Sequence, residues 1–214
     1  YQQDVEQQAE KIPDTLDAKE IARRRDMRGV TTFTIDPADA KDFDDALSIR
    51  RLPNGNFEVG VHIADVTHYV HPGDMIDAEG QSRATSVYLV DRTVPMLPER
   101  LSNGLCSLRP NEEKLCFSAI FELSPEAEVQ QEWFGRTVIY SDRRFTYQEA
   151  QDVIETGRGD LSDEILLLND LAQKLRAERF RNGSINFERD EAKFELDENG
   201  KPLRVYFKEI KESN

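Results

Sequence analysis

Five aspartates lie within ten residues of this chain, from Asp36 to Asp45 in the segment TIDPADAKDFDD. Carboxylates this close repel one another and raise each other's pKa, so a fold accommodates them most easily around a cation. Hard divalent cations such as Mg²⁺ take oxygen ligands and usually retain waters and substrate phosphate. The cluster therefore indicates a metal site that binds phosphate and supports phosphoryl chemistry.

An aspartate-rich stretch is more often a solvated loop, because aspartate favours turns and helix caps. The flanking residues favour a site instead. Residues 31–35 have the β-branched and aromatic content of a strand, Pro37 ends strand pairing, and residues 46–49 resume an extended pattern. We therefore expect the acids to emerge from a strand end, with short returns on both sides that let them converge on one point.

A calcium-binding EF-hand loop is a competing explanation that the spacing excludes. If Asp42 were the first ligand, Leu47 would occupy the position of the sharp-turn glycine. Pro53 would then stand at the twelfth position, where the loop needs a bidentate glutamate.

Other residues that commonly bind metals do not have ligand spacing here. His62, His68 and His71 are near one another in sequence but are not paired as on a metal-binding helix, and we interpret them as structural. Cys106 and Cys116 are too few for a disulfide framework and have no metal spacing. We expect both cysteines to be buried, reduced thiols of a cytoplasmic protein.

The composition is that of a globular protein with a large charged surface. The chain has 214 residues, of which 38% are hydrophobic and 33% charged, enough for one large domain or one and a half. We find neither a signal peptide nor an apolar run of membrane-spanning length, and we expect no membrane association.

The net charge is strongly negative, −14 from 28 basic and 42 acidic residues. Because Lys and Arg make the contacts to phosphate, such a chain is a poor generic nucleic-acid binder. Binding of nucleic acid would have to be local, through a metal and a few basic or aromatic groups, or reside in other parts of a longer protein.

The elements that must hold the acidic cluster are strands first and helices later. Pro53–Asn56 is a turn signal between two extended runs, which predicts a hairpin packed on one face immediately after the cluster. A capping box at residues 146–149 opens one helix, and Asn182–Gly183 closes a second. The expected strands are 31–35, 46–51, 57–64, 117–123, 129–141, 184–196 and 202–210, and the expected helices are 76–84, 98–104, 146–155 and 162–181.

Residues 1–28 are polar, and we interpret them as a linker or short surface helix leading into the domain. This segment carries the arginines Arg23–Arg25 and Arg28. A basic run of this kind favours a solvated face over phosphate contacts.

The acidic segment resembles the signature of the catalytic domain of the ribonuclease II and ribonuclease R family. Further motifs of that family follow in the same order, and their agreement makes the resemblance specific. It covers roughly residues 29–214, and the ribonuclease R branch is closest. The additional motifs are Val61–Val70, Thr85–Leu89, Val94–Pro98, Leu101–Leu108 and Gly183–Phe187.

The resemblance implies a processive 3′→5′ exoribonuclease that hydrolyses single-stranded RNA to nucleoside 5′-monophosphates by a two-metal mechanism. The family's four acidic positions around Mg²⁺, with Mn²⁺ as an alternative ion, match Asp36, Asp42, Asp44 and Asp45. Asp36 and Asp45 are expected to be principal ligands, and Asp42 and Asp44 to be catalytic as well. Loss of Asp44 should stop chemistry with the least loss of RNA binding. Asp39 falls at a variable position and is left out of the set.

Two aromatic residues are implied as contacts to the RNA. Tyr88 matches a family tyrosine that packs on the terminal nucleotide, and stacking on a base face tolerates any sequence. Phe194 is a second, looser match to a stacking aromatic, and a core phenylalanine is an equal alternative.

The resemblance also implies domain organisation. We expect residues 1–28 to be an N-terminal extension and residues 29–214 to be the N-terminal part of the catalytic domain, truncated at its C-terminus. The expected fold is α+β, with a mixed, largely antiparallel sheet and flanking helices. Family members continue with a segment that carries a catalytic arginine, and they carry flanking cold-shock and S1-type RNA-binding domains, so the isolated chain is expected to be inactive or very weak.

Two other functions stay open. One is a different two-metal phosphoesterase that acts on DNA or a small phosphate ester. The other is a non-enzymatic acidic module that binds a metal such as Ca²⁺ or another protein.

Overall fold

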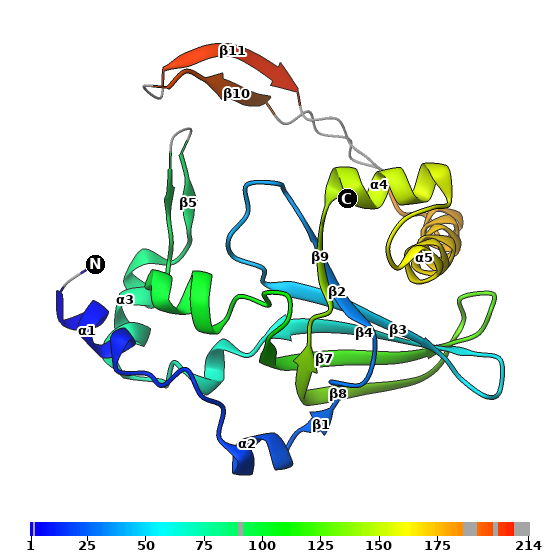
Figure 1. Cartoon of the computed structure of the whole chain (residues 1–214), viewed down its shortest axis with the longest axis horizontal. Helices are drawn as coiled ribbons and strands as arrows, with labels where there is room; N and C mark the ends of the chain where they lie inside the picture. The colour runs from blue at the N-terminus through cyan, green and yellow to red at the C-terminus, as the bar shows by residue number, and fades with distance from the viewer. Residues whose placement is uncertain (2, 90–91, 186–191, 199–200, 208–214) are drawn as a thin grey trace.

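Seven strands form one mixed sheet in the computed structural model, which describes the chain except residues 2, 90–91, 186–191, 199–200 and 208–214 (Figure 1). The strand order is β1-β8-β7-β4-β3-β2-β9. Only the pairs β1/β8 and β2/β9 are parallel, so the sheet is largely antiparallel, as expected. The strands are β1 (Arg25–Asp26), β2 (Thr32–Asp36), β3 (Asp45–Arg51), β4 (Phe57–Ala64), β7 (Glu113–Leu123), β8 (Val129–Tyr140) and β9 (Arg143–Thr146).

The predicted hairpin of β3 and β4 is confirmed, with Asp45 opposite Ile63 and Arg51 opposite Phe57. Its expected packing on one face is wrong. Strand β4 lies at the centre of the sheet, and side chains on both of its faces are buried. Glu58 pairs there with Arg25 and Arg50, and the His62 ring lies between Ser48 and Ser118.

The first helical layer packs on one face of the sheet. It contains α1 (Gln3–Glu10), α3 (Met75–Arg83) and the π-helix η2 (Arg100–Leu105), and α1 packs against α3. Their apolar residues meet Cys116 and Ile120 of β7 in the largest core cluster. Both expected short helices are therefore present, and they lie beside the acidic segment, since Phe43 belongs to the same cluster.

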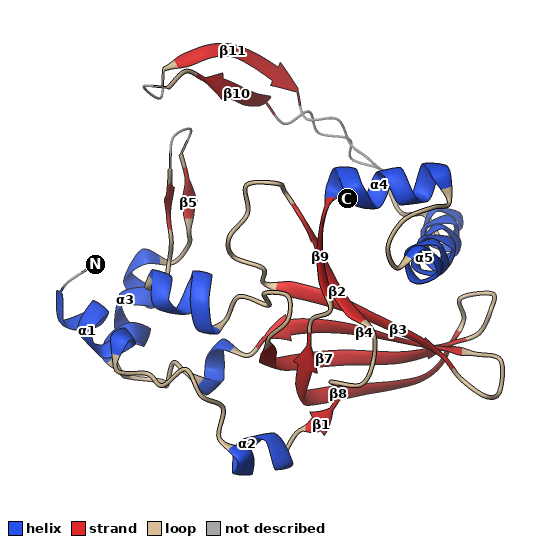
Figure 2. Ribbon diagram, viewed as in Figure 1, coloured by secondary structure: helices blue, strands red, loops and turns tan. Residues whose placement is uncertain are grey.

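The second layer is made by α4 (Tyr147–Thr156) and α5 (Ser162–Arg181), on the other face of the sheet (Figure 2). The predicted capping box is present, with Thr146 and Glu149 each accepting a backbone N–H of the other. Leu161 precedes α5 in a left-handed conformation, and Asn182 ends it as expected. No helix in the described ranges is long and apolar enough to cross a membrane.

The N-terminal segment packs on the domain instead of forming a free linker. Val5 and Ala9 of α1 and Met27 after β1 are buried in the largest core cluster, and β1 extends the sheet beside β8. Its scattered apolar residues are too few to reveal this packing in the sequence. The expected domain boundary near residue 28 stays a prediction.

The interpretation of the arginine run as a solvated face is wrong for Arg24. Its guanidinium is buried, 2.7 Å from the carboxylate of Asp65 and 2.9 Å from Glu20. The neighbouring Arg25 pairs with Glu58 and lies over the ring of Trp133. These arginines join the N-terminal segment to the sheet.

Two small hairpins stand apart from the sheet (Figure 1). One pairs β5 (Val87–Tyr88) with β6 (Thr93–Val94). The other pairs β10 (Ala192–Leu196) with β11 (Pro202–Phe207) and confirms the expected final hairpin. The parts of its predicted strands at 186–191 and 208–210 lie outside the described residues.

Candidate active site

The acidic residues gather where β2 ends and β3 begins. Asp36 is the last residue of β2 and Asp45 the first residue of β3, and these strands are neighbours in the sheet. Residues 37–44, here called the acidic loop, connect them and rise between the β5–β6 hairpin and β9 (Figure 1). The end of β2 and the start of β3 therefore place Asp36 and Asp45 close enough to interact electrostatically, and the loop adds Asp42 and Asp44.

Asp36 is the buried member of the group, with 8% of the residue exposed. Its Oδ2 atom is buried without a hydrogen-bond partner in the described structure. Burial raises the pKa of this carboxyl, and the charges of Asp45 and Asp42 also raise it, against the opposing effects of the Thr34 hydroxyl and the Arg144 guanidinium. A buried carboxylate oxygen without a partner is a favourable position for a cation.

Asp44 interacts electrostatically with the other three acids. Although the residue is exposed, surrounding protein atoms desolvate its carboxyl group, and this desolvation is the main cause of its raised pKa. Repulsion from Asp42, Asp45 and Asp36 adds to the increase. The four predicted ligands thus form one electrostatic cluster.

Oxygen-rich donors suit Mg²⁺ or Mn²⁺, so the chemistry of these residues fits such an ion. Their arrangement is more open than a closed coordination shell. Over the described ranges, no group of three or more His, Cys, Asp or Glu side chains is arranged to hold a metal ion. The loop carboxylates would have to approach Asp36 for several of them to bind one ion.

The side chain of Tyr88 contacts the acidic loop. Its hydroxyl donates a hydrogen bond to Oδ2 of Asp42 over 3.3 Å. The residue is 68% exposed, so most of the ring is available to a ligand. Partial burial of the phenol, followed by the charge of Asp42, raises the pKa of Tyr88.

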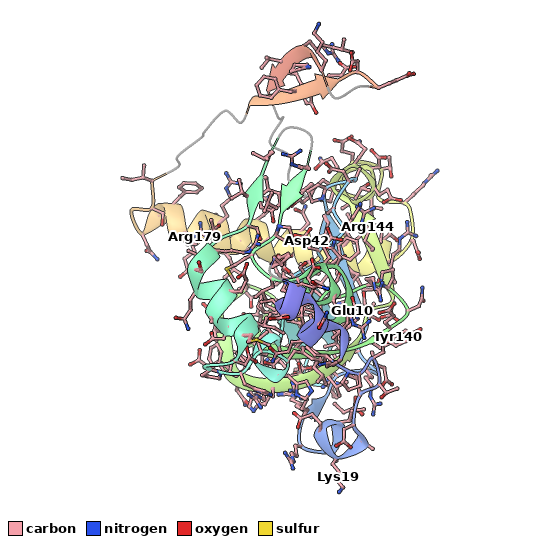
Figure 3. The ribbon with its side chains drawn as sticks, turned by 90° about the vertical axis from the view of Figure 1, so that its left-hand side faces the viewer. Glu10, Lys19, Asp42, Tyr140, Arg144 and Arg179 are labelled. Carbon is pink, nitrogen blue, oxygen red and sulfur yellow. The ribbon has the colours of Figure 1, made fainter. Side chains whose placement is uncertain are left out.

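Strand β9 contributes residues that the sequence analysis missed. Because β9 runs parallel to β2, Arg144 lies opposite Thr34 and Thr146 lies opposite Asp36. The Arg144 guanidinium donates to the carbonyl of Pro37 at the start of the acidic loop, and it lies 5.4 Å from the ring centre of Phe43. In the view of Figure 3, Asp42 lies below the β5–β6 hairpin and Arg144 lies to the right of Asp42.

Tyr147, directly after β9, is also close to the acids. Burial and then the charges of Asp36 and Asp45 raise its pKa. The pair Arg143-Arg144 before the capping box is the one sequence signal for this region. It does not reveal the pairing, because β9 and β2 are more than a hundred residues apart in sequence.

The remaining candidate lies away from the acids. Phe194 belongs to β10, is 43% exposed, and pairs across the hairpin with Val205. In Figure 1 that hairpin stands above the sheet, separate from the acidic loop. The structure therefore does not bring Phe194 to the site, and its role stays a prediction. Asp39, left out of the ligand set, is exposed in the loop.

Of the residues interpreted as structural, His62 and both cysteines fit that interpretation, whereas His68 is half-buried and His71 is exposed. His62 is fully buried, with its ring nitrogens 2.7 Å from Ser118 Oγ and 2.8 Å from Ser48 Oγ. Burial, helped by Arg25, lowers the pKa of His62 to about 4, so the ring is neutral at neutral pH. Cys106 and Cys116 are buried free thiols.

The RNB domain model matches residues 24–214, nearly nine-tenths of the chain. This chain belongs to the RNB-domain family. Among curated RNB relatives, DIS3-like exonuclease 2 of Schizosaccharomyces pombe is 45% identical over 212 residues, and ribonuclease R 1 of Lactococcus lactis is 43% identical over 211 residues. The matches cover 92% and 96% of this chain but 23% and 26% of those proteins. The chain thus spans about a quarter of their length.

A solved RNB structure matches the whole chain. Mycoplasma genitalium RNase R, in complex with ribose-methylated single-stranded RNA, superposes with a TM-score of 0.92 at 29% identity. The match covers 100% of this chain and 34% of that one. The same RNase R in complex with double-stranded RNA gives 0.91. Not every RNB relative is named an active nuclease, since an Arabidopsis thaliana relative at 39% identity is named inactive exonuclease DIS3L2.

Proposed function

We propose that this chain provides the acidic, metal-binding part of a 3′→5′ exoribonuclease that hydrolyses single-stranded RNA to nucleoside 5′-monophosphates. The observation that carries the proposal is the meeting of Asp36, Asp42, Asp44 and Asp45 at one sheet edge, with Tyr88 hydrogen-bonded to Asp42. The named activities of the RNB relatives and the RNA complexes of RNase R support the choice of substrate.

Asp36, Asp42, Asp44 and Asp45 would hold Mg²⁺, or Mn²⁺ in its place. When bound, the ions supply activation of water and neutralisation of phosphate charge. Without a cation the four carboxylates repel one another, and this repulsion adds to the pKa increase that burial causes at Asp36 and Asp44. A phosphodiester that approached this edge alone would meet the same repulsion, so substrate and cation should bind here together.

The aromatic and basic side chains would orient the RNA. The exposed ring of Tyr88 offers a stacking surface for a terminal base, and its hydroxyl is held by Asp42 at 3.3 Å. Stacking does not depend on base identity, which suits a degradative enzyme. Since Asp42 belongs to the ligand set, stacking of the base and binding of the ion would be coupled through one side chain.

Catalysis is proposed for a longer protein that contains this chain. The curated relatives are about four times as long as this chain. The resemblance implies that a phosphate-contacting arginine and RNA-binding domains lie in other segments of such proteins, and none of the motifs matched here contains them. With a net charge of −14, the chain itself has no excess of basic residues to attract RNA. We expect the isolated chain to be inactive or very weak.

Release of nucleoside 5′-monophosphates from single-stranded RNA tests this function. The longer protein should release them in the presence of Mg²⁺, and Asp44→Asn should abolish release while RNA binding is largely kept. Asp39→Asn is a matched control, because it removes an exposed aspartate of the same loop and should leave release unchanged. Robust release by the isolated chain would overturn the need for a further arginine, and release by the Asp44→Asn protein would overturn the proposed site.

A non-catalytic acidic module is the second candidate. It is favoured by the relative named inactive and by the open arrangement of the carboxylates in the described residues. Titration of Mn²⁺ and Ca²⁺ into the wild type, Asp45→Asn and Asp39→Asn separates the two. Binding of Mn²⁺ that only Asp45→Asn loses supports the catalytic site, whereas preference for Ca²⁺ or absence of binding supports the module.

A further inference from the structure

The acidic loop has little structure of its own. Within it, the one backbone hydrogen bond in the described structure runs from the Ala40 N–H to the Pro37 carbonyl over 3.1 Å. At its far end the Asp44 carbonyl accepts from Ala64 N–H over 3.0 Å. A loop with so few internal bonds, carrying like charges, needs contacts from outside to hold one shape.

Ser107 supplies such contacts at the middle of the loop. Its hydroxyl oxygen accepts a hydrogen bond from Phe43 N–H over 3.0 Å and donates one to the Lys41 carbonyl over 3.0 Å. Next to it, Leu108 N–H donates to the Phe43 carbonyl over 2.8 Å. Lys41 and Phe43 are the two neighbours of Asp42, so these three bonds fix the backbone on both sides of that carboxylate.

Burial makes the Ser107 contact specific. Ser107 is 0% exposed, so water cannot replace its hydroxyl, and only a small side chain with both a donor and an acceptor satisfies Phe43 and Lys41 at once. Phe43 is buried in the same core cluster as Leu105 and Leu108. With Phe43 directed inward, Asp42 on its flank is left to face Tyr88.

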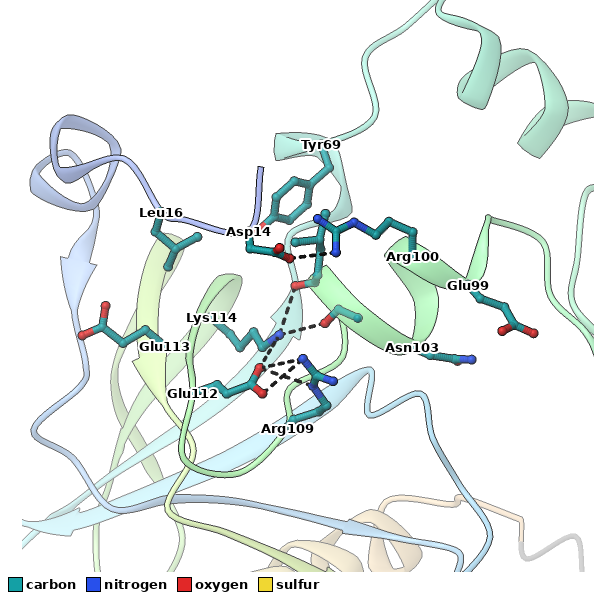
Figure 4. Close-up of a pocket in the computed structure, with 12 residues that line it drawn as sticks. Asp14, Leu16, Tyr69, Glu99, Arg100, Asn103, Arg109, Glu112, Glu113 and Lys114 are labelled. Atoms are coloured by element: carbon teal, nitrogen blue, oxygen red, sulfur yellow. Dashed lines mark hydrogen bonds and ion pairs between the residues drawn. The ribbon is translucent and has the colours of Figure 1, made fainter. Parts of the chain in front are cut away.

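The segment that carries Ser107 is itself anchored. The π-helix η2 ends at Leu105, and the ammonium of Lys114 on β7 donates to the carbonyl of Gly104 over 2.8 Å. The same ammonium pairs with Glu112 over 2.9 Å. Figure 4 shows Lys114 between Glu112 and the end of this helix. Lys114 of the sheet therefore anchors the end of η2, and Ser107, two residues after η2, anchors the acidic loop.

We propose that Ser107 is a positioning residue of the acidic site, whose buried hydroxyl fixes the loop so that Asp42 faces Tyr88 and the neighbouring aspartates. Its function as part of a metal site rests on the function proposed above, whereas its effect on loop order does not. Ser107 touches no reacting group and acts through the backbone of Lys41 and Phe43.

Amide hydrogen exchange of the 214-residue chain tests loop order directly. In Ser107→Ala the Phe43 N–H loses its acceptor, and its exchange should accelerate by roughly tenfold or more. Ser107→Cys keeps the branching of the side chain but brings a larger sulfur atom that hydrogen-bonds weakly. It should accelerate exchange as well, so a folding defect of one variant does not leave the question open. Unchanged exchange at Phe43 in the folded variants would overturn the proposal.

Ser118→Ala is the matched control. Ser118 is also a buried serine with two side-chain partners, His62 and Thr137, but it lies in β7, and within the described structure its hydroxyl makes no hydrogen bond to the acidic loop. Ser118→Ala should lower the melting temperature by about as much as Ser107→Ala does, and it should leave the exchange rate of the Phe43 amide as in the wild type. Acceleration at Phe43 in both variants would mean general loosening and would overturn a specific role of Ser107.

Titration with Mn²⁺ tests the link to the metal site. Support of a ligand by a second residue typically changes metal affinity by about 10–100-fold, so Ser107→Ala should weaken Mn²⁺ binding by roughly tenfold while Ser118→Ala keeps it. Equal affinity in wild type and Ser107→Ala would overturn the positioning role. If the wild type does not bind Mn²⁺, the metal site proposed above fails, and the exchange experiment still decides whether Ser107 orders the loop.

Discussion

At the residue scale, the acids of this site differ in their partners. Asp42 accepts a hydrogen bond from Tyr88, whereas the buried Oδ2 atom of Asp36 has no partner in the described structure. A buried polar atom without a partner reduces the free energy of unfolding by about 1–3 kcal/mol. The protein tolerates this cost at Asp36, which is expected where an oxygen is reserved for a ligand.

Two substitutions of Tyr88 separate stacking from hydrogen bonding. Tyr88→Ala should weaken binding of single-stranded RNA by about 1–3 kcal/mol, because it removes the stacking surface. Tyr88→Phe keeps the ring and loses the 3.3 Å bond to Asp42, so it should cost about 1 kcal/mol or less. Fluorescence anisotropy with a labelled oligoribonucleotide measures both. Wild-type binding by Tyr88→Ala would remove this residue from the RNA site.

His62 predicts a specific pH dependence of stability. Its pKa falls from 6.5 to about 4 on folding, so the unfolded chain takes up the proton first as the pH decreases. The stabilisation is fully present above pH 6.5 and is lost as the pH falls toward about 4, a change of about 3 kcal/mol. Urea unfolding at several pH values should show a shallower decrease for His62→Gln, and identical slopes would contradict the prediction.

At the element scale, one buried ion pair fastens the N-terminal segment to the sheet. Arg24, between α2 (Ala18–Ala22) and β1, reaches Asp65 at the end of β4 over 2.7 Å. It also donates to the carbonyls of Cys116 and Thr137 on β7 and β8. Burial alone would raise the pKa of Asp65, but hydrogen bonds from Thr67 and Arg24 hold it below its usual value.

Substitution of Arg24 should therefore be strongly destabilising. Arg24→Met keeps most of the volume but leaves the Asp65 charge buried, at an expected cost of about 3–5 kcal/mol in the free energy of unfolding. Arg23→Met is the control, because Arg23 has a side chain that is 75% exposed and pairs with Glu20 only at 3.7 Å. That change should cost about 1 kcal/mol or less. Denaturant unfolding measures both, and equal costs would contradict the anchoring role.

At the scale of the whole molecule, the negative net charge opposes the approach of RNA to the proposed site. A net charge of −14 repels RNA, yet the proposed site must receive a phosphate beside a cluster of four aspartates. Local recruitment of cations is the physical solution, since a bound divalent ion reverses the sign of the field where it is needed.

Binding of RNA to this chain should therefore depend on divalent ions more than on general salt. At constant ionic strength, added Mg²⁺ should increase binding of single-stranded RNA by the wild type and by Asp39→Asn, but not by Asp45→Asn. Filter binding or anisotropy measures the difference. Tight binding without Mg²⁺ that weakens steeply with salt would indicate an ordinary basic surface and contradict the prediction.

Local signals in the sequence were enough for much of the fold and for the positions of Asp36 and Asp45 at the strand ends. The β3–β4 hairpin follows from a turn between alternating strands, and α4 follows from its capping box. The meeting of Asp36 and Asp45 follows from one strand ending and the next beginning. Each depends on residues close in sequence, whose geometry the backbone largely fixes.

Only the tertiary structure decided which distant segments complete the site. The pairing of β9 with β2 brings Arg144 to Pro37, and the buried turn after η2 brings Ser107 to Phe43. It also decided that Arg24 is buried, although its neighbours in sequence are alike in type. These contacts join residues tens to more than a hundred positions apart, and strand order and burial, which set them, are properties of the packed whole rather than of any local pattern.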